Sequence, residues 1–230
     1  MPNEKQKLPD EKILTKPQIG NNLVVYKLQI KRVRKYVDGG MKIMKKKLFE
    51  FKTKTLVATG LGAALFTVLF MYVKIPTGIP ETQIQTAYGI GAFFGALFGP
   101  IAAGLIAFIG HFLSDSIQYG SAWMSWVIAS AVACFITGLV YPRLHVEEGE
   151  FGLKDIIQFN VFQIVGNIIA WILIAPVLDI VIYAEPANLV FTQGAVAALT
   201  NAVSAGVIGT ILLVIYSKTR AGKGTLKKGE

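Results

Sequence analysis

The sequence predicts an all-α integral membrane protein with six transmembrane helices and both termini on the cytoplasmic side. Of its 230 residues, 53% are hydrophobic and only 16% are charged, whereas an ordinary soluble domain is about a quarter charged. Apolar runs long enough to cross a bilayer core, which takes about 20 residues, recur along the chain. The Lys and Arg residues gather at the two ends, with 15 of the 23 in residues 1–54 and five in residues 218–230.

Six apolar runs mark the expected spans, and prolines bound several of them. In order along the chain they cover 55–73, 84–98, 100–118, 122–141, 156–175 and 190–216. Gly99-Pro100 separates the second span from the third, since proline suits the first turn of a helix. The fourth and fifth spans are expected to end before Pro142 and Pro176. The second span is too short to cross a bilayer upright without its flanks, because a helix rises about 1.5 Å per residue.

The placement of basic residues predicts the orientation of the spans. Loops 74–83, 119–121 and 176–189 together hold one basic residue, Lys74, while the other side of the membrane holds many. Cytoplasmic loops carry the excess of Lys and Arg, so both termini and the 142–155 loop are predicted to be cytoplasmic.

The chain is expected to divide into three parts: a leader at 1–40, a six-helix membrane domain at 41–217 and a basic cytoplasmic tail at 218–230. The leader has no apolar run of signal-peptide length, so a cleaved secretory signal is not expected. A fresh start at Met41, MKIMKKKLFEF, indicates that the leader is disordered or artefactual. Alternatively, its segment LVVYKLQIKRVRKYV forms a basic helix on the membrane surface.

The chain has none of the motifs expected of an enzyme. GKG at 222–224 lacks the upstream glycine and the Ser or Thr of a phosphate-binding loop, and neither H-E-x-x-H nor G-x-S-x-G occurs. Cys134 is the single cysteine, which excludes an intrachain disulfide and a cysteine-based metal site. The body of the chain has no basic stripe with interleaved aromatics, so nucleic-acid binding is not expected. No catalytic residue, cofactor or metal is predicted, and ATP-driven transport would need a partner's ATPase.

Polar residues at lipid depth are the first candidates for a binding site, because they usually face a bundle interior or a cavity. In the third span His111, Asp115 and Gln118 follow i, i+4, i+7 and share one helix face. This spacing predicts a solute site that opens outward, or else a structural His–Asp pair. In the sixth span Gln193 and Asn201 share a face with Ser204. For these three side chains, contact with a ligand and packing between helices are equally weighted alternatives.

A second polar stripe follows the fifth span, where Asn160, Gln163, Asn167 and Trp171 are spaced i, i+3, i+7, i+11. Amides both donate and accept hydrogen bonds, so they suit a neutral heterocycle with ring nitrogens and hydroxyls. The alternative is interhelical amide bonding, which is common in membrane proteins and is favoured for Asn160.

Aromatic residues and loops complete the candidate site. Trp123 and Trp126 begin the fourth span, and Tyr88 lies near the outer end of the second; each could stack on a ligand ring or anchor the chain at the membrane interface. Loop 74–83 could be a lid over an outward pocket or a plain connection. Asp179 and Glu185 are expected to be solvated in an outer loop. The candidate substrate-binding residues are Gln85, Tyr88, His111, Asp115, Trp123, Trp126, Gln163, Asn167, Trp171 and Asn201.

Small residues dominate the first span. The pairs Ala58/Gly62, Thr59/Ala63 and Gly60/Ala64 all follow the small-xxx-small spacing that lets helices approach closely. Three overlapping pairs give more small surface than one internal neighbour needs, which predicts docking onto a partner subunit.

The sequence resembles the substrate-binding (S) components of energy-coupling factor (ECF) vitamin transporters, over about residues 41–217. The similarity lies in TKTLVATGLGAALF, in IPTGIPETQIQTAYGIGAFFGALFGPIAAGLIAFIGHFLSD and in YGSAWMSWVIAS. The resemblance implies a six-helix protein with an outward-facing vitamin site covered by the loop after the first span. It implies a coupling membrane subunit and two ATPase subunits as partners, with docking through Ala58, Gly62 and Ala63.

The resembled group is linked to hydroxymethylpyrimidine, a thiamine precursor, and to pyridoxine. The predicted function is therefore capture of such a vitamin or precursor from outside and its delivery inward by the ECF complex. One alternative is a self-sufficient proton-coupled carrier built on Asp115 and His111. An intramembrane enzyme using the same pair is the weakest reading, because no nucleophile or metal set accompanies it.

Overall fold

The computed structural model describes residues 30, 52–80 and 82–220. The predicted leader, apart from Ile30, and the tail beyond residue 220 lie outside the described residues. The chain divides into two compact units, Met1–Ile43 and Met44–Glu230. The second unit holds the whole bundle described below.

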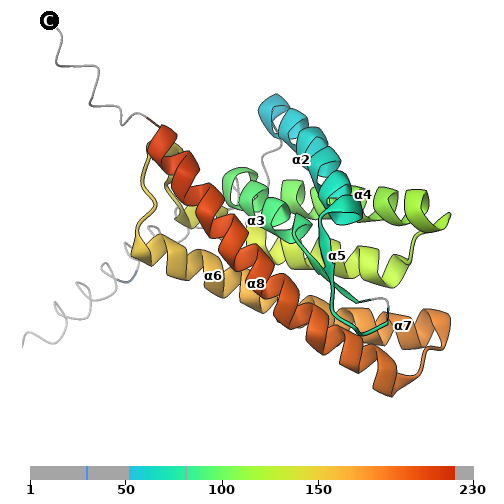
Figure 1. The fold of residues 1–230 in the computed structure, drawn as a ribbon. Helices are drawn as coiled ribbons and strands as arrows, with labels where there is room; N and C mark the ends of the chain where they lie inside the picture. Colours follow the sequence, from blue (N-terminus) through green and yellow to red (C-terminus); the bar gives the residue numbers. More distant parts are fainter. Residues whose placement is uncertain (1–29, 31–51, 81, 221–230) are drawn as a thin grey trace, which may run out of the picture. The chain divides into compact units, whose positions relative to one another are not determined.

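Residues 52–80 and 82–220 form helices and one small hairpin (Figure 1). The elements are α2 (Thr53–Tyr72), β1 (Lys74–Pro76), β2 (Gln83–Gln85), α3 (Ala87–Phe98), α4 (Pro100–Tyr119), α5 (Met124–Gly138), the 3-10 turns η1 (Tyr141–Arg143) and η2 (Val146–Glu148), α6 (Leu153–Ile168), the π-helical segment η3 (Ile169–Ile174), α7 (Ala175–Tyr183) and α8 (Ala187–Thr219). Strands β1 and β2 pair antiparallel. The predicted all-helical class is confirmed.

Five of the helices are long and apolar enough to cross a membrane. They are α2, α4, α5 with η1, the continuous helix formed by α6, η3 and α7, and α8. The remaining predicted span is the 12-residue helix α3, which begins at Ala87 rather than at 84 because β2 takes Gln83–Gln85. A 12-residue helix is about 18 Å long, so α3 does not reach across a bilayer core by itself.

The punctuation between α3 and α4 follows the prediction. Gly99 has φ +90°, a backbone conformation that L side chains rarely adopt, and Pro100 occupies the first turn of α4. A Cβ on Gly138 of α5 would lie 2.5 Å from the Cα of Pro100. The turn between α3 and α4 therefore packs directly on the backbone of α5.

The predicted end of the fifth span before Pro176 is wrong. The helix runs without a break from Leu153 to Tyr183, through the π-helical segment η3. In a regular α-helix the Pro176 ring would clash with the carbonyl of Ile172 and leave that carbonyl without its N–H donor. The wider π turn, which bonds i to i+5, changes the hydrogen-bond register just before the proline and lets the helix continue.

The outer loop predicted at 176–189 is therefore shorter in the structure. Only Ala184–Pro186 separates α7 from α8, and Ala184 ends α7 in the left-handed conformation. Asp179, expected to be solvated in that loop, instead lies on α7 and is 2% exposed.

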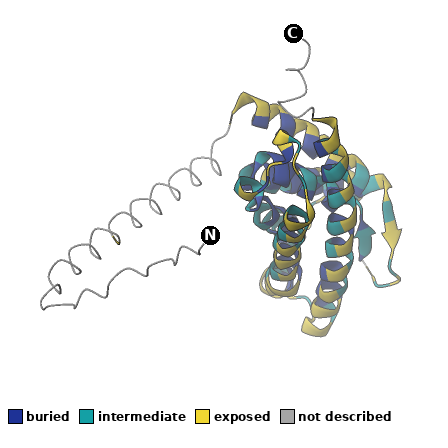
Figure 2. Ribbon diagram, turned by 90° about the vertical axis from the view of Figure 1, so that its left-hand side faces the viewer, coloured by how far each residue is buried: buried dark blue, intermediate teal, exposed yellow. Residues whose placement is uncertain are grey.

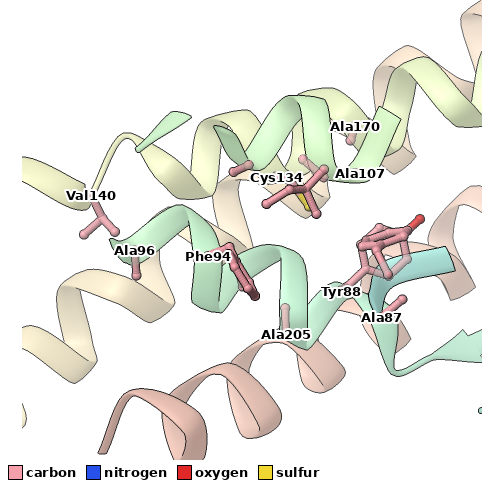
Figure 3. Packing of buried hydrophobic residues seen from close by; sticks show 14 of the residues in the cluster. Ala87, Tyr88, Phe94, Ala96, Ala107, Cys134, Val140, Ala170 and Ala205 are labelled. Carbon is pink, nitrogen blue, oxygen red and sulfur yellow. The ribbon is translucent and has the colours of Figure 1, made fainter. Parts of the chain in front are cut away.

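Helix α3 lies at the centre of the packing and contacts α2, α4, α5 and α8. Figure 3 shows buried residues of α3 among those of α4, α5, η3 and α8: Ala87, Tyr88, Phe94, Ala96, Ala107, Cys134, Ala170 and Ala205. Many of the buried residues are alanines, so the helices approach closely. Large apolar residues such as Val181 (75% exposed) and Leu199 (68%) are exposed. Figure 2 shows the exposed residues along the outer sides of the helices. This surface suits lipid rather than water.

Candidate functional site

A cavity of about 500 Å³ opens at the end of the bundle that carries the hairpin β1–β2, hereafter the hairpin end. Its size falls within the range of ligand pockets. Eight of the ten predicted substrate-binding residues line it: Gln85, Tyr88, His111, Asp115, Trp123, Trp126, Trp171 and Asn201. They come from β2, α3, α4, α5, η3 and α8, so the fold brings residues up to 116 positions apart into one site.

Aromatic rings form one wall of the cavity. Trp171, which is 1% exposed, lies edge-on to two other rings: the Trp126 ring centroid is 5.2 Å away at 64°, and the Tyr88 centroid is 5.8 Å away at 83°. Edge-to-face contacts of this kind favour fixed ring positions. The wall is thus organised before any ligand enters.

A chain of hydrogen bonds runs behind the cavity from α3 to α4. The Tyr88 hydroxyl and His111 Nδ1 each lie 2.7 Å from Ser130 Oγ, and His111 Nε2 lies 3.4 Å from Asp115 Oδ1. The predicted His–Asp pair is therefore formed, and both of its members also line the cavity. Ser130 was missed by the sequence analysis; its one signal was its position four residues after Trp126 on the same helix face.

Asp179, which the sequence analysis placed in a solvated loop, belongs to the cavity lining. Its Oδ1 accepts hydrogen bonds from Trp123 Nε1 (2.7 Å) and from Ser125 Oγ, and its Oδ2 accepts one from Trp126 Nε1 (2.8 Å). Asp115 Oδ2 accepts the backbone N–H of Trp123 at 3.1 Å. Both carboxylates therefore meet the first turn of α5, where the helix dipole favours negative charge.

The hairpin segment contributes to the cavity lining and is hydrogen-bonded to α8. Gln193 Nε2 donates to the Pro80 carbonyl at 2.9 Å, and Ser204 Oγ donates to the Gln85 carbonyl at 2.7 Å. Pro80, Gln83 and Gln85 all line the cavity. Loop 74–83 is thus more than a connection between two spans. Gln118 lies outside the lining and accepts a hydrogen bond from Lys74 Nζ at 2.8 Å.

Three buried polar atoms on the cavity lining have no hydrogen-bond partner among the described residues. They are Gln85 Oε1, Trp171 Nε1 and Asn201 Oδ1, and their residues are 7%, 1% and 2% exposed. A buried polar group without a partner costs about 1–3 kcal/mol. Each of these atoms is itself covered by neighbouring protein atoms, so a ligand reaches it only if side chains on the lining move.

The polar stripe of α6 lies beneath the cavity and does not line it. Asn160 Nδ2 donates to Thr210 Oγ1 of α8 at 3.1 Å, Gln163 Nε2 to Asn160 Oδ1 at 3.2 Å, and Asn167 Nδ2 to the Gln163 carbonyl at 2.9 Å. Gln163 and Asn167 are the two predicted substrate residues absent from the lining. Asn160 makes the interhelical bond that the packing interpretation expected.

The charge of the cavity is one-sided. Asp115, Asp179 and Glu185 are on the lining, and none of the lining residues within the described ranges is Lys or Arg. Solutes bearing a phosphate or carboxylate would meet repulsion there, whereas neutral or cationic rings would not.

The structure turns the predicted docking residues inward. Ala58 and Ala63 are 9% and 4% exposed, and a Cβ on Gly62 would lie 2.6 Å from Ile106 Cδ1 of α4. These three residues pack against other parts of the same chain. The third small pair faces out: Gly60 and Ala64 are exposed, and a Cβ on Gly60 would meet nothing within 4 Å.

Comparison with known proteins identifies the family. A family model described as the S component of an ECF-type riboflavin transporter matches residues 50–218. A UPF0397 protein of Exiguobacterium sp. is 57% identical over 178 residues, which cover 77% of this chain and 97% of the relative. UPF0397 proteins of Enterococcus faecalis and Lactiplantibacillus plantarum are each 49% identical, over 80% and 76% of this chain and 100% and 94% of the relatives. No solved structure matches the chain.

The resemblance seen in the sequence is thus confirmed at the level of the family. The match covers the whole bundle from α2 to α8. The chain belongs to the S-component family of ECF-type transporters, and it is accordingly a multi-pass bacterial membrane protein without enzymatic activity that binds a vitamin-type substrate.

Proposed function

We propose that this S component captures an unphosphorylated single-ring B-vitamin or precursor, of the hydroxymethylpyrimidine or pyridoxine type. The main support for this proposal is the cavity of about 500 Å³. Its lining includes an aromatic wall, three residues with unpaired polar atoms and three carboxylates. Aromatic rings and a few convergent polar groups are what small-molecule sites require.

The pattern of unpaired atoms fits a single amino- or hydroxyl-bearing ring. The protein offers two acceptors, Gln85 Oε1 and Asn201 Oδ1, and one donor, Trp171 Nε1. An aminopyrimidine supplies two N–H donors and ring-nitrogen acceptors, and pyridoxine supplies hydroxyl donors and a ring nitrogen.

Native mass spectrometry of protein from cells grown in rich medium tests the substrate directly. We expect a bound mass of a pyrimidine or pyridoxine compound, confirmed by a thermal shift with the same compound and not with riboflavin. A bound riboflavin mass would overturn the single-ring assignment and agree with the description of the family model. No bound mass and no thermal shift with any B-vitamin would remove the proposed substrate class.

The orientation proposed for capture has the hairpin end outside and both termini in the cytoplasm. Helix α2, about 30 Å long, runs from Lys54 at one end to β1 at the other. At the end away from the hairpin, Lys54 Nζ contacts Glu147 Oε1 at 2.7 Å and Arg220 lies 4.0 Å from the same atom. The gathering of bases at that end supports its cytoplasmic placement.

Delivery inward is proposed to require a coupling membrane subunit and two ATPase subunits. The outward face of α2, with Gly60 and Ala64 at its centre, supports a docking role because small residues let a partner helix approach closely. The proton-coupled alternative rests on the buried His111–Asp115 pair. Proton-driven uptake by vesicles that hold this chain alone would support that alternative against the proposal.

Leucine substitutions on the two sides of α2 separate docking from packing. Gly60→Leu is expected to abolish co-purification with the coupling subunit and to leave ligand affinity unchanged. Gly62→Leu is expected to lower the stability of the isolated chain by about 1–3 kcal/mol, because the new side chain overpacks Ile106. Pull-down and thermal unfolding measure the two effects. If Gly60→Leu still forms the complex, α2 does not dock through this face.

Two buried asparagines test how far the site extends. Asn201→Ala is expected to weaken ligand binding about 5- to 10-fold, because one ligand hydrogen bond of about 1 kcal/mol is lost. Asn167, equally buried at 2% exposed but off the lining, should give a smaller loss when replaced by alanine. Thr192→Ala, an exposed site on the same helix as Asn201, is the neutral control. Calorimetric titration compares them; an unchanged Asn201→Ala affinity would contradict the proposed contact.

A further inference from the structure

Asp179 is a buried acid that the capture of a ligand does not by itself explain. It is 2% exposed, and none of the ion pairs among the described residues includes it. Its negative charge is satisfied by three hydrogen bonds instead, two from indole N–H groups and one from the Ser125 hydroxyl. Hydrogen bonds to a charged acceptor are stronger than those between neutral groups.

The bonds to Asp179 set the positions of two rings on the cavity wall. An indole has a single donor, Nε1, and the donors of Trp123 and Trp126 both reach this one carboxylate. Tyr183, one turn further along α7, stacks on the Trp123 ring at 4.1 Å and accepts the backbone N–H of Met124 at 3.1 Å. Side chains of α7 therefore bind both the backbone and the two indoles at the start of α5.

The π-helical segment η3 explains why Asp179 points to the same side as Trp171. In an uninterrupted α-helix, at about 100° per residue, Asp179 would lie about 80° around from Trp171. A π turn absorbs roughly one extra residue, so the separation becomes that of about seven residues, or about 20°. Both side chains then line the cavity, as observed.

We infer that Asp179 is a positioning residue that determines specificity: it fixes the indoles of Trp123 and Trp126 as a rigid wall against which the ligand ring lies. A carboxylate has about four acceptor sites, and three of those on Asp179 are occupied within the protein. Its hydrogen bonds therefore act on the ligand through the positions of the two indoles. This inference rests on the proposed function for its effect on ligand affinity, but not for the contacts themselves.

A mutant cycle tests whether Asp179 acts through the indoles. Asp179→Asn keeps the size of the side chain but loses one acceptor oxygen, and should weaken binding at least 10-fold in the wild-type chain. The Trp123→Phe/Trp126→Phe variant keeps both rings but removes the donors, and should show a similar loss. In that background Asp179→Asn should change the affinity less than twofold. Multiplicative losses would mean that Asp179 acts independently of the indoles, which would overturn the inference.

A ligand-independent measurement keeps the test separate from the choice of substrate. Ultraviolet resonance Raman spectra report hydrogen bonding of indole N–H groups, and the chain has three tryptophans. Two of them should show strong bonding in the wild type, and Asp179→Asn should weaken that signal while Trp171, which is unpaired, stays the same. An unchanged spectrum would disprove the inference that Asp179 holds the two indoles. The binding probes are hydroxymethylpyrimidine, pyridoxine and riboflavin. If none of them binds the wild type, the proposed function fails, while the Raman spectra still test whether Asp179 holds the two indoles.

Should Asp179→Asn fail to fold, the indole variant carries the test. Trp123→Phe/Trp126→Phe keeps an apolar ring at each position, and its thermal midpoint should fall by several degrees because Asp179 retains only the Ser125 hydroxyl of its three side-chain donors. A tenfold loss of affinity in this folded variant, together with a change in the ratio of affinities among the three probes, supports the inference. Wild-type affinity for all three probes would overturn it.

Discussion

Replacing Gly194 with alanine is expected to lower the thermal unfolding midpoint by about 5 °C or more and to weaken ligand binding at least tenfold. A Cβ at this position would lie 2.2 Å from the backbone carbonyl oxygen of Trp171. Backbone cannot move aside as a flexible side chain can, so α8 must shift away from η3. Overpacking of this kind costs about 1–3 kcal/mol or more, which for a chain of this size is several degrees.

Affinity should fall together with stability because the two elements that must separate both line the cavity. Trp171 is on η3, and Gln193 and Asn201 are on α8. Thermal unfolding and calorimetric titration of the same preparation measure both effects. Gly60→Ala is the matched control, since its Cβ would meet nothing within 4 Å. If Gly194→Ala binds ligand as tightly as the wild type, close contact between α8 and η3 is not needed to shape the site.

Much of the helix plan could be predicted because a bilayer imposes simple rules on a sequence. Spans need about 20 apolar residues, and Pro100 after Gly99 begins a helix where it was expected to. Pro176 was misinterpreted by the same logic. A proline ends an α-helix, yet a π turn just before it removes the clash at little cost, and nothing in ILIAPVLDI distinguishes the two outcomes.

The misplacement of Asp179 follows from that one error. A helical wheel that counts 100° per residue cannot place a residue beyond a π turn, and a helix thought to end at 175 left Asp179 in a loop. Similarly, the stripe from Asn160 to Trp171 shows which face of α6 is polar, but not how deep the cavity reaches. The cavity lining includes Trp171 and does not include Asn167, and the spacing of polar residues along one helix does not determine that limit.

The small residues of α2 also show what residue spacing alone does not determine. Three small-xxx-small pairs occur on one helix, and spacing alone does not tell which face packs inside the chain. Gly62 faces Ile106, while Gly60 faces outward. The excess of small surface motivates the proposed docking contact; of the residues concerned, Ala58, Gly62 and Ala63 lie on the inner face and Gly60 and Ala64 on the outer face.

Phosphate esters of the ligand are expected to bind at least 100-fold more weakly than the free alcohol. Asp115, Asp179 and Glu185 line the cavity without a Lys or Arg among the described lining residues. At an effective dielectric constant of about 20, two like charges about 6 Å apart repel by about 3 kcal/mol, which is about a hundredfold in Kd. Competition titrations with pyridoxine and pyridoxine phosphate, or riboflavin and its phosphate, measure the ratio for whichever compound binds.

Variants of Glu185 test whether the charge of the cavity causes the preference for the alcohol over its phosphate ester. Glu185 lies on the lining and is partly exposed, so Glu185→Lys reverses one charge without disturbing the buried carboxylates. The ratio between ester and alcohol should then fall at least tenfold, with the affinity for the alcohol within about threefold of its wild-type value. Glu185→Gln should give an intermediate ratio, because it removes the charge without reversing it. Equal binding of ester and alcohol by the wild type would overturn the charge argument for an unphosphorylated substrate.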